Sequence, residues 1–121
     1  MMKISQAERE KVIKSLMEIQ GRYHSATSWA VMYGNLEDYA RSRGVEVYAA
    51  KNLATAFRMW GCYQPYLKTI YIQIRDIGKM VSDLAHEVGH MMVFNAGFLK
   101  KYEFDEPLAD ALGHALVDIL S

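Results

Sequence analysis

Several features that would assign the chain to a special class of protein are scarce or missing among its 121 residues. A single cysteine, Cys62, excludes an internal disulfide framework. Fourteen Lys and Arg balance fourteen Asp and Glu, so the chain lacks the positive charge that is typical of nucleic-acid-binding proteins. Apolar runs such as residues 91–94 fall far short of the roughly 20 residues that a membrane-spanning helix needs. We therefore expect neither a direct nucleic-acid partner nor a membrane span.

What is present is the composition of an ordinary globular domain. The chain is 51% hydrophobic and 23% charged, and its length is too short for two independent cores of ordinary size. The lone cysteine and the absence of an apolar leader in residues 1–6 favour a reducing, cytoplasmic setting. We expect a single cytoplasmic domain that spans residues 1–121.

Helical patterns are expected at both ends of the chain. A capping-box pair, Ser5 and Glu8, precedes apolar residues at helical spacing until Gly21. Asn35 is interpreted as the cap of a short helix that ends at Gly44. The other segments with a helical period are residues 23–33, 77–94 and 107–119, with residues 95–105 as the connection between the last two.

The middle of the chain changes to the alternation that is typical of strands. Apolar residues alternate with other residues at 45–48 and again at 70–74. Residues 57–63 form a third candidate strand, which residues 64–66 are expected to turn back toward the next one. These patterns predict an α+β fold with N-terminal helices and a small, mostly antiparallel three-stranded sheet.

The most informative segment is the motif H-E-x-x-H, formed by His86, Glu87 and His90 within the helix expected over residues 77–94. At about 100° per residue, these three side chains fall within roughly a quarter turn. Two histidines at positions i and i+4 can direct one ring nitrogen each at a zinc ion, and the glutamate beside the first can act as a general base. The motif predicts Zn²⁺ as the cofactor, His86 and His90 as ligands and Glu87 as the catalytic residue.

A catalytic zinc ion needs a third protein ligand and an open fourth position. Glu106 stands at the start of the last helix, where Pro107 suits the first turn and the helix dipole favours a carboxylate. We predict that Glu106 is this third ligand. Asp110, one turn later, is predicted to accept the second N–H of a histidine ligand and to set its tautomer. His114 and Cys62 remain alternative third ligands.

Together these residues resemble the ImmA/IrrE group of metallopeptidases. The resemblance runs from about Val45 to the C-terminus and rests on the strand at 70–74, A-H-E-x-G-H at 85–90 and E-x-x-A-D at 106–110. Asp110 stands where an asparagine is common in the group. The resemblance implies a zincin-like fold and a gluzincin-type site, with H-E-x-x-H on the active-site helix and the third ligand on the C-terminal helix. It also implies that the strand at 70–74 lies along the substrate cleft.

The expected function is zinc-dependent hydrolysis of peptide bonds in a protein or peptide substrate. An extended substrate would add to an edge of the sheet, with Tyr71 and Gln73 as substrate-binding side chains. The resemblance further implies a regulatory protease that cleaves a repressor-like protein of a mobile element or phage, together with a regulatory protein partner. The residue that stabilises the oxyanion remains open among Tyr63, Tyr102, His24 and His114.

Two other classes of function remain open. A small-molecule zinc hydrolase would have a deep closed pocket, whereas a peptidase needs an open groove. A non-catalytic protein-interaction module with a retained zinc site would bind its partner through an aromatic surface. The aromatic residues available for such a surface are Trp29, Tyr33, Tyr39, Trp60, Tyr63 and Tyr66.

Overall fold

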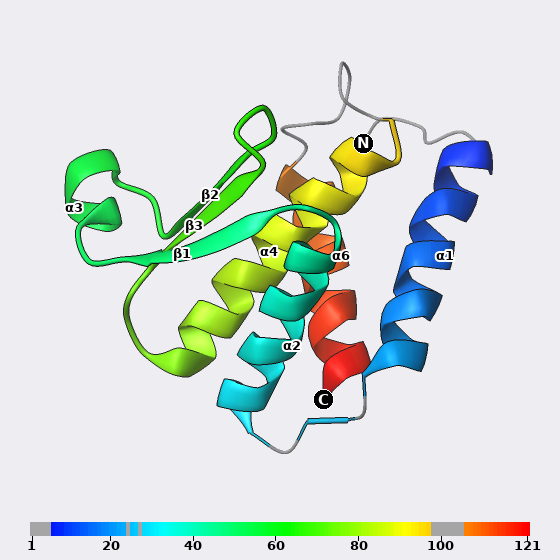
Figure 1. The fold of residues 1–121 in the computed structure, drawn as a ribbon, viewed down its shortest axis with the longest axis horizontal. Helices are drawn as coiled ribbons and strands as arrows, with labels where there is room; N and C mark the ends of the chain where they lie inside the picture. The colour runs from blue at the N-terminus through cyan, green and yellow to red at the C-terminus, as the bar shows by residue number, and fades with distance from the viewer. Residues whose placement is uncertain (1–5, 24, 27, 98–105) are drawn as a thin grey trace.

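In the computed structural model, which describes residues 6–23, 25–26, 28–97 and 106–121, most of the helices gather beside a small three-stranded sheet (Figure 1). The α+β class expected from the sequence is confirmed. Among the described helices, none is both long and apolar enough to cross a membrane. The elements are α1 (Gln6–Arg22), α2 (Trp29–Ser42), β1 (Glu46–Ala50), α3 (Leu53–Phe57), β2 (Gly61–Gln64), β3 (Thr69–Gln73), α4 (Ile77–Asn95) and α6 (Glu106–Leu120).

The sheet has the order β1-β3-β2, with β3 in the centre. β3 pairs in parallel with β1 and in antiparallel with β2. The expectation of a mostly antiparallel sheet is therefore wrong, because one of the two pairings is parallel. The physical reason is that the chain leaves β1 through α3 and forms β2 before it returns as β3, so that β3 runs in the direction of β1.

Two predicted elements differ from the observed ones because local backbone signals override the apolar pattern. The strand expected over residues 57–63 begins only at Gly61, since α3 extends to Phe57 and ends where Arg58 adopts a left-handed conformation with φ of 54°. The two helical stretches expected around residues 23–44 form one helix, α2. Its N-cap is Ser28, whose hydroxyl accepts a hydrogen bond from the N–H of Val31.

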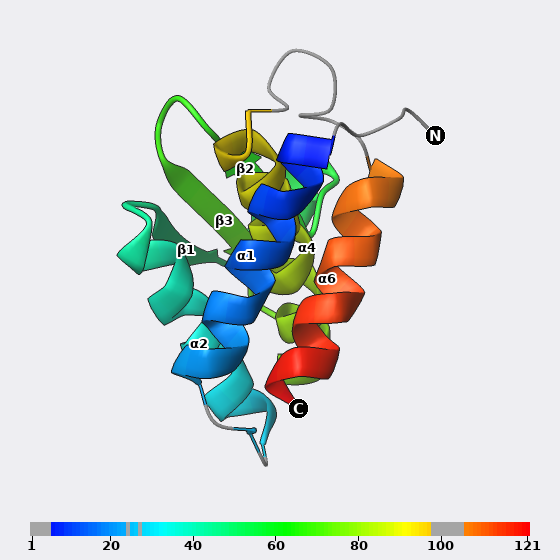
Figure 2. The ribbon, with the colours of Figure 1, turned by 90° about the vertical axis from the view of Figure 1, so that its right-hand side faces the viewer.

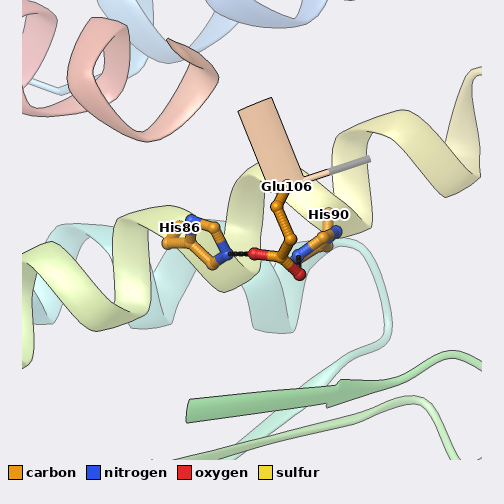
Figure 3. A group of neighbouring side chains, drawn as sticks. All are labelled: His86, His90 and Glu106. Carbon is orange, nitrogen blue, oxygen red and sulfur yellow. Dashed lines mark hydrogen bonds and ion pairs between the residues drawn. The ribbon is translucent and has the colours of Figure 1, made fainter. Parts of the chain in front are cut away.

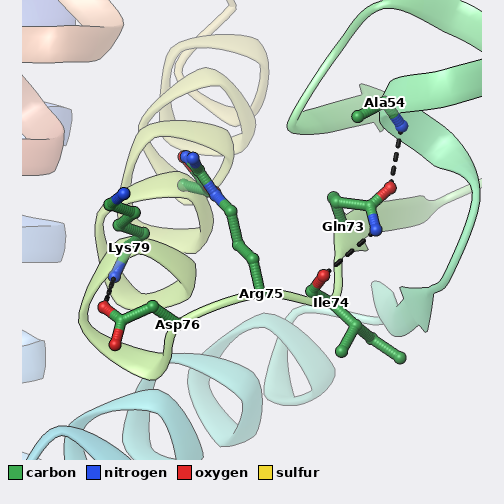
Figure 4. Close-up of polar contacts among 7 residues, drawn as sticks. Ala54, Gln73, Ile74, Arg75, Asp76 and Lys79 are labelled. Carbon is green, nitrogen blue, oxygen red and sulfur yellow. Dashed lines mark hydrogen bonds and ion pairs between the residues drawn. The ribbon is translucent and has the colours of Figure 1, made fainter.

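Helix α4 crosses the centre of the molecule between the sheet and the remaining long helices (Figures 1 and 2). It begins at the N-cap Asp76, whose carboxylate accepts a hydrogen bond from the N–H of Lys79 (Figure 4). Apolar residues from α4, β3 and α6 form a continuous core, and burying each such side chain stabilises the fold by about 1.5–3 kcal/mol. Core residues that are fully buried include Ile70, Ile72, Val81, Leu84, Val88 and Leu116.

Two glycines bring α6 unusually close to α4. A Cβ atom added at Gly89 would lie 2.7 Å from the carbonyl oxygen of Ala109, and one added at Gly113 would lie 3.1 Å from the backbone nitrogen of His86. Because neither glycine carries a side chain, the two backbones can approach at the level of the H-E-x-x-H motif. This close contact determines how far a side chain from the start of α6 must reach to touch the histidines.

Candidate metal centre and active site

The three predicted zinc ligands converge at the place where α6 begins beside α4 (Figure 3). Glu106 reaches between the two histidines, with its Oε2 atom 2.7 Å from Nε2 of His86 and its Oε1 atom 3.1 Å from Nε2 of His90. One ligand atom from each of the three residues lies within 4.8 Å of the other two. The structure thus brings together residues from two helices that are separate in the sequence.

The donor atoms suit a zinc ion in their chemistry and lie near enough to one another to hold a metal. Two imidazole nitrogens and one carboxylate are a ligand set of catalytic zinc sites, and three protein ligands leave the fourth position available. Around a tetrahedral ion with bonds of about 2.0–2.1 Å, ligand atoms stand about 3.3 Å apart. The two oxygens of Glu106 lie 2.7 and 3.1 Å from the histidine nitrogens, and the three ligand atoms lie within 4.8 Å of one another. The side chains must therefore draw closer together to bind a single ion. In their chemistry the residues present are suited to Zn²⁺.

Comparison of the whole chain with known proteins leaves its function open. No protein-family model, curated protein or solved structure matches it. The candidate site must therefore be interpreted from its own geometry and chemistry.

Asp110 lies one turn along α6 from Glu106 and contacts the other nitrogen of a candidate ligand. Its Oδ1 atom is 2.8 Å from Nδ1 of His86, which is the contact expected from the sequence. If Nδ1 of His86 donates its N–H to Asp110, Nε2 is the nitrogen whose lone pair is available to a metal ion. The two carboxylates of α6 thus hold opposite sides of one imidazole ring.

The alternative third ligands lie outside the group of three. Within the described part of the chain, the group with metal-ligand spacing consists of His86, His90 and Glu106. His114 is exposed beside a smaller hollow that Asp110 also lines, and Cys62 lies on β2. Two of the candidate oxyanion donors, Tyr102 and His24, lie outside the described residues.

Glu87 is buried next to the candidate ligands, and the pKa of its carboxyl is raised. Its side chain is 7% exposed, and burial raises the pKa of its carboxyl to about 7, with the nearby charge of Glu106 acting in the same direction and His86 opposing it. Burial alone lowers the pKa of His86, but the charges of Glu87 and Glu106 and the contact with Asp110 raise it overall. A carboxyl that titrates near neutral pH is well suited to both accept and return a proton.

Strand β2 passes directly beside Glu87, which sequence reasoning missed. A Cβ atom added at Gly61 would lie 3.1 Å from both Cγ and Oε2 of Glu87, so a side chain at this position would displace the carboxylate. The backbone N–H of Tyr63 donates a hydrogen bond to that carboxylate. A glycine within a strand signals close approach of another group, and this signal at Gly61 could have pointed to the contact.

A cavity of about 480 Å³ joins the candidate ligands to β2. Apart from the candidate ligands and Glu87, its walls are mostly apolar or aromatic. Tyr63, one of the candidate oxyanion donors, and Cys62, an alternative third ligand, are among these wall residues. The lining residues other than the ligands and Glu87 are Met59, Trp60, Gly61, Cys62, Tyr63, Pro65, Asp83 and Phe94.

The two residues predicted to bind substrate, Tyr71 and Gln73, do not line this cavity. The amide oxygen of Gln73 accepts from the N–H of Ala54, and its amide nitrogen donates to two backbone carbonyl groups (Figure 4). Tyr71 stacks on Tyr48, with ring centroids 6.0 Å apart. Both residues belong to β3, which is the central strand and has no open edge. The strand beside the cavity is β2, in place of the strand at 70–74 that the resemblance implied.

Proposed function

We propose that the protein is a zinc-dependent hydrolase of peptide bonds, in which His86, His90 and Glu106 bind the metal and Glu87 is the general base. The observation that carries this proposal is the convergence of three ligand atoms within 4.8 Å beside a buried glutamate that lines the same cavity. When bound, zinc supplies Lewis acidity that polarises a carbonyl group and activates water.

The carboxylate of Glu87 performs the proton transfers. It accepts a proton from the attacking water and returns it to the nitrogen of the leaving amine. The hydrogen bond from the N–H of Tyr63 and the contact with Gly61 hold the carboxylate in position. Asp110 acts on His86 alone and keeps the ring oriented toward the metal.

An extended peptide is the substrate that the open side of β2 favours. In the β2–β3 ladder the N–H of Gln73 donates to the carbonyl of Trp60, so Trp60 and Gln73 form a hydrogen-bonded pair. Because hydrogen-bonded and non-hydrogen-bonded pairs alternate in such a ladder, the backbone groups of Gly61 and Tyr63 point away from β3. The N–H of Tyr63 already donates to Glu87, so a peptide on this side would pair with Gly61 and with the carbonyl group of Tyr63. Such a peptide would pass next to Glu87 and the metal position.

The proposal is tested by cleavage of a peptide library with zinc-loaded protein, followed by mass spectrometry of the products. We expect the wild type to cleave and Glu87→Gln to lose about 10²- to 10⁴-fold in rate, because it lacks the general base, while it retains its zinc. A matched control is Asp118→Ala, which changes an exposed carboxylate near the other end of α6 and should leave the rate unchanged. Cleavage by Glu87→Gln at the wild-type rate would contradict the proposal.

Absence of cleavage by the zinc-loaded wild type would favour a protein-interaction module instead. Among the aromatic residues considered for such a surface, Trp29, Trp60 and Tyr66 are 49%, 50% and 81% exposed, whereas Tyr39 is buried. The narrower expectation of a repressor-like substrate would be tested by offering such proteins to the wild type and to Glu87→Gln.

A further inference from the structure

The cavity beside the candidate metal centre is bounded by aromatic side chains at the C-terminal end of α4. Phe94 lies one turn beyond His90, and its ring meets the ring of Tyr63 edge to face at a centroid distance of 6.1 Å. The ring of Tyr66 meets Phe94 in the same manner at 6.4 Å. Such edge-to-face pairs are favourable and hold Phe94 in one orientation. We use the name Phe94 wall for Tyr63, Pro65 and Phe94, which all line the cavity.

Elsewhere the cavity is lined by one member of an ion pair. Among the described residues that line the cavity, the only charge outside the candidate ligands and Glu87 belongs to Asp83. Arg75 donates two hydrogen bonds to this carboxylate, at 2.9 and 3.0 Å, and its guanidinium lies 3.9 Å from the ring centroid of Trp60. Because Asp83 is already paired, it is poorly placed to attract a charged side chain of a substrate.

Strand β2 runs beside α4 from the level of Glu87 toward the Phe94 wall. Gly61 contacts Glu87, and Tyr63 contacts Phe94 further along α4, so β2 and α4 run side by side in the same direction. A peptide on the open side of β2 would therefore extend from Glu87 toward the Phe94 wall. Any side chain that it directs into the cavity there would meet apolar and aromatic atoms.

We infer that the substrate is an extended peptide with a large apolar or aromatic side chain near the scissile bond, which the Phe94 wall receives. This inference rests on the proposed function for the position of the scissile bond. Burial of one such side chain against the wall favours it over alanine by on the order of tenfold or more. Charged side chains at the same position would lose their hydration without gaining a partner.

The experiment uses zinc-loaded, immobilised Glu87→Gln protein and a library of end-capped octapeptides with degenerate positions. Retained peptides are sequenced by mass spectrometry, so that binding is measured without turnover. We expect Phe, Tyr, Leu and Met to be enriched about tenfold over Ala, Asp and Lys at one position. Adding Phe94→Ala should remove most of this enrichment, and Phe94→Leu should restore the enrichment of aliphatic residues. Adding Met17→Ala, which truncates an exposed apolar residue on α1, should leave the enrichment unchanged.

The outcomes separate this inference from the proposed function. Retention of no peptide, retention without residue preference, or enrichment of charged residues would overturn the inference. Cleavage of the same library by the wild type without an apolar preference would overturn it as well, while the proposed function would stand. Selective retention of apolar peptides by Glu87→Gln, combined with no cleavage by the zinc-loaded wild type, would support the apolar preference of the Phe94 wall and overturn the proposed function together with the position of the scissile bond.

Discussion

Replacing Gly89 by alanine perturbs the contact that brings the candidate zinc ligands of the two helices together. The added Cβ atom would lie 2.7 Å from the carbonyl oxygen of Ala109 and 3.3 Å from Cβ of Leu112. Favourable contacts between such atoms lie near 3.5 Å, so α6 must move away from α4 by several tenths of an ångström. The obstacle is a backbone carbonyl group, which cannot move aside as a flexible side chain would.

Two opposing effects determine the change in the free energy of unfolding. Alanine in place of glycine stabilises a helix interior by about 1 kcal/mol, whereas overpacking of a well-packed core costs about 1–3 kcal/mol. We expect the overpacking to dominate at Gly89 and to give a net loss of about 1–2 kcal/mol. Because Ala109 directly precedes Asp110, the same movement displaces the carboxylates of α6 from the histidines. Zinc affinity should fall on the order of tenfold.

Urea unfolding of the zinc-free protein and competition with a chromogenic zinc chelator measure the two effects. Gly34→Ala is the matched control, because Gly34 lies within α2 and a Cβ atom there would meet nothing within 4 Å. This control should gain up to about 1 kcal/mol and keep its zinc affinity. The reasoning is refuted if Gly89→Ala is as stable as Gly34→Ala and binds zinc as tightly as the wild type.

Three further predictions concern polar contacts. Asp110→Ala should weaken zinc binding by about 10- to 100-fold in chelator competition. Asp110→Asn can still accept a hydrogen bond and should retain most of the affinity. Equal zinc affinity of Asp110→Ala and the wild type would contradict the positioning role of Asp110. Arg75→Ala should lower the free energy of unfolding by about 1–3 kcal/mol, because it leaves the half-buried Asp83 without this partner. A loss below about 0.5 kcal/mol in urea unfolding would contradict this prediction. Burial and the hydrogen bond to a neighbouring carboxylate raise the pKa of Tyr23 to about 12. The stability that comes from this shift is complete below pH 10 and is lost as the pH rises through 12. Tyr23→Phe should therefore flatten the decrease of the urea midpoint between pH 10 and 12. A decrease as steep as that of the wild type would contradict this prediction.

The grouping of the three candidate ligands could be predicted because each part of it depends on local sequence. His86 and His90 share a face through helical spacing alone, and the start of α6 is signalled by Pro107 after Glu106. The prediction placed the start of the last helix beside the histidines because a catalytic zinc ion needs a third protein ligand. The contacts of Gly89 and Gly113 that bring the helices together are made mainly with backbone atoms, so a hydrophobic pattern does not reveal them.

The residues that line the cavity could not be predicted because alternation identifies a strand without identifying its neighbours. Residues 70–74 have the clearer strand pattern, yet β3 is central and its residues Tyr71 and Gln73 contact other parts of the fold. The edge strand β2 has four residues, and its beginning depends on the left-handed Arg58. Pairing order in a sheet is a property of the whole chain, which explains why the cavity wall had to be located in the structure.

The metal content of the purified protein tests the central claim most directly. Zinc per chain is measured by elemental mass spectrometry after saturation with zinc and removal of the unbound ion, for the wild type, Glu87→Gln and Glu106→Ala. We predict about one zinc ion in the wild type and in Glu87→Gln, and a sharp loss in Glu106→Ala, since a catalytic site needs three protein ligands. A wild type that holds no zinc, or a Glu106→Ala variant that holds as much as the wild type, would contradict the proposed metal centre.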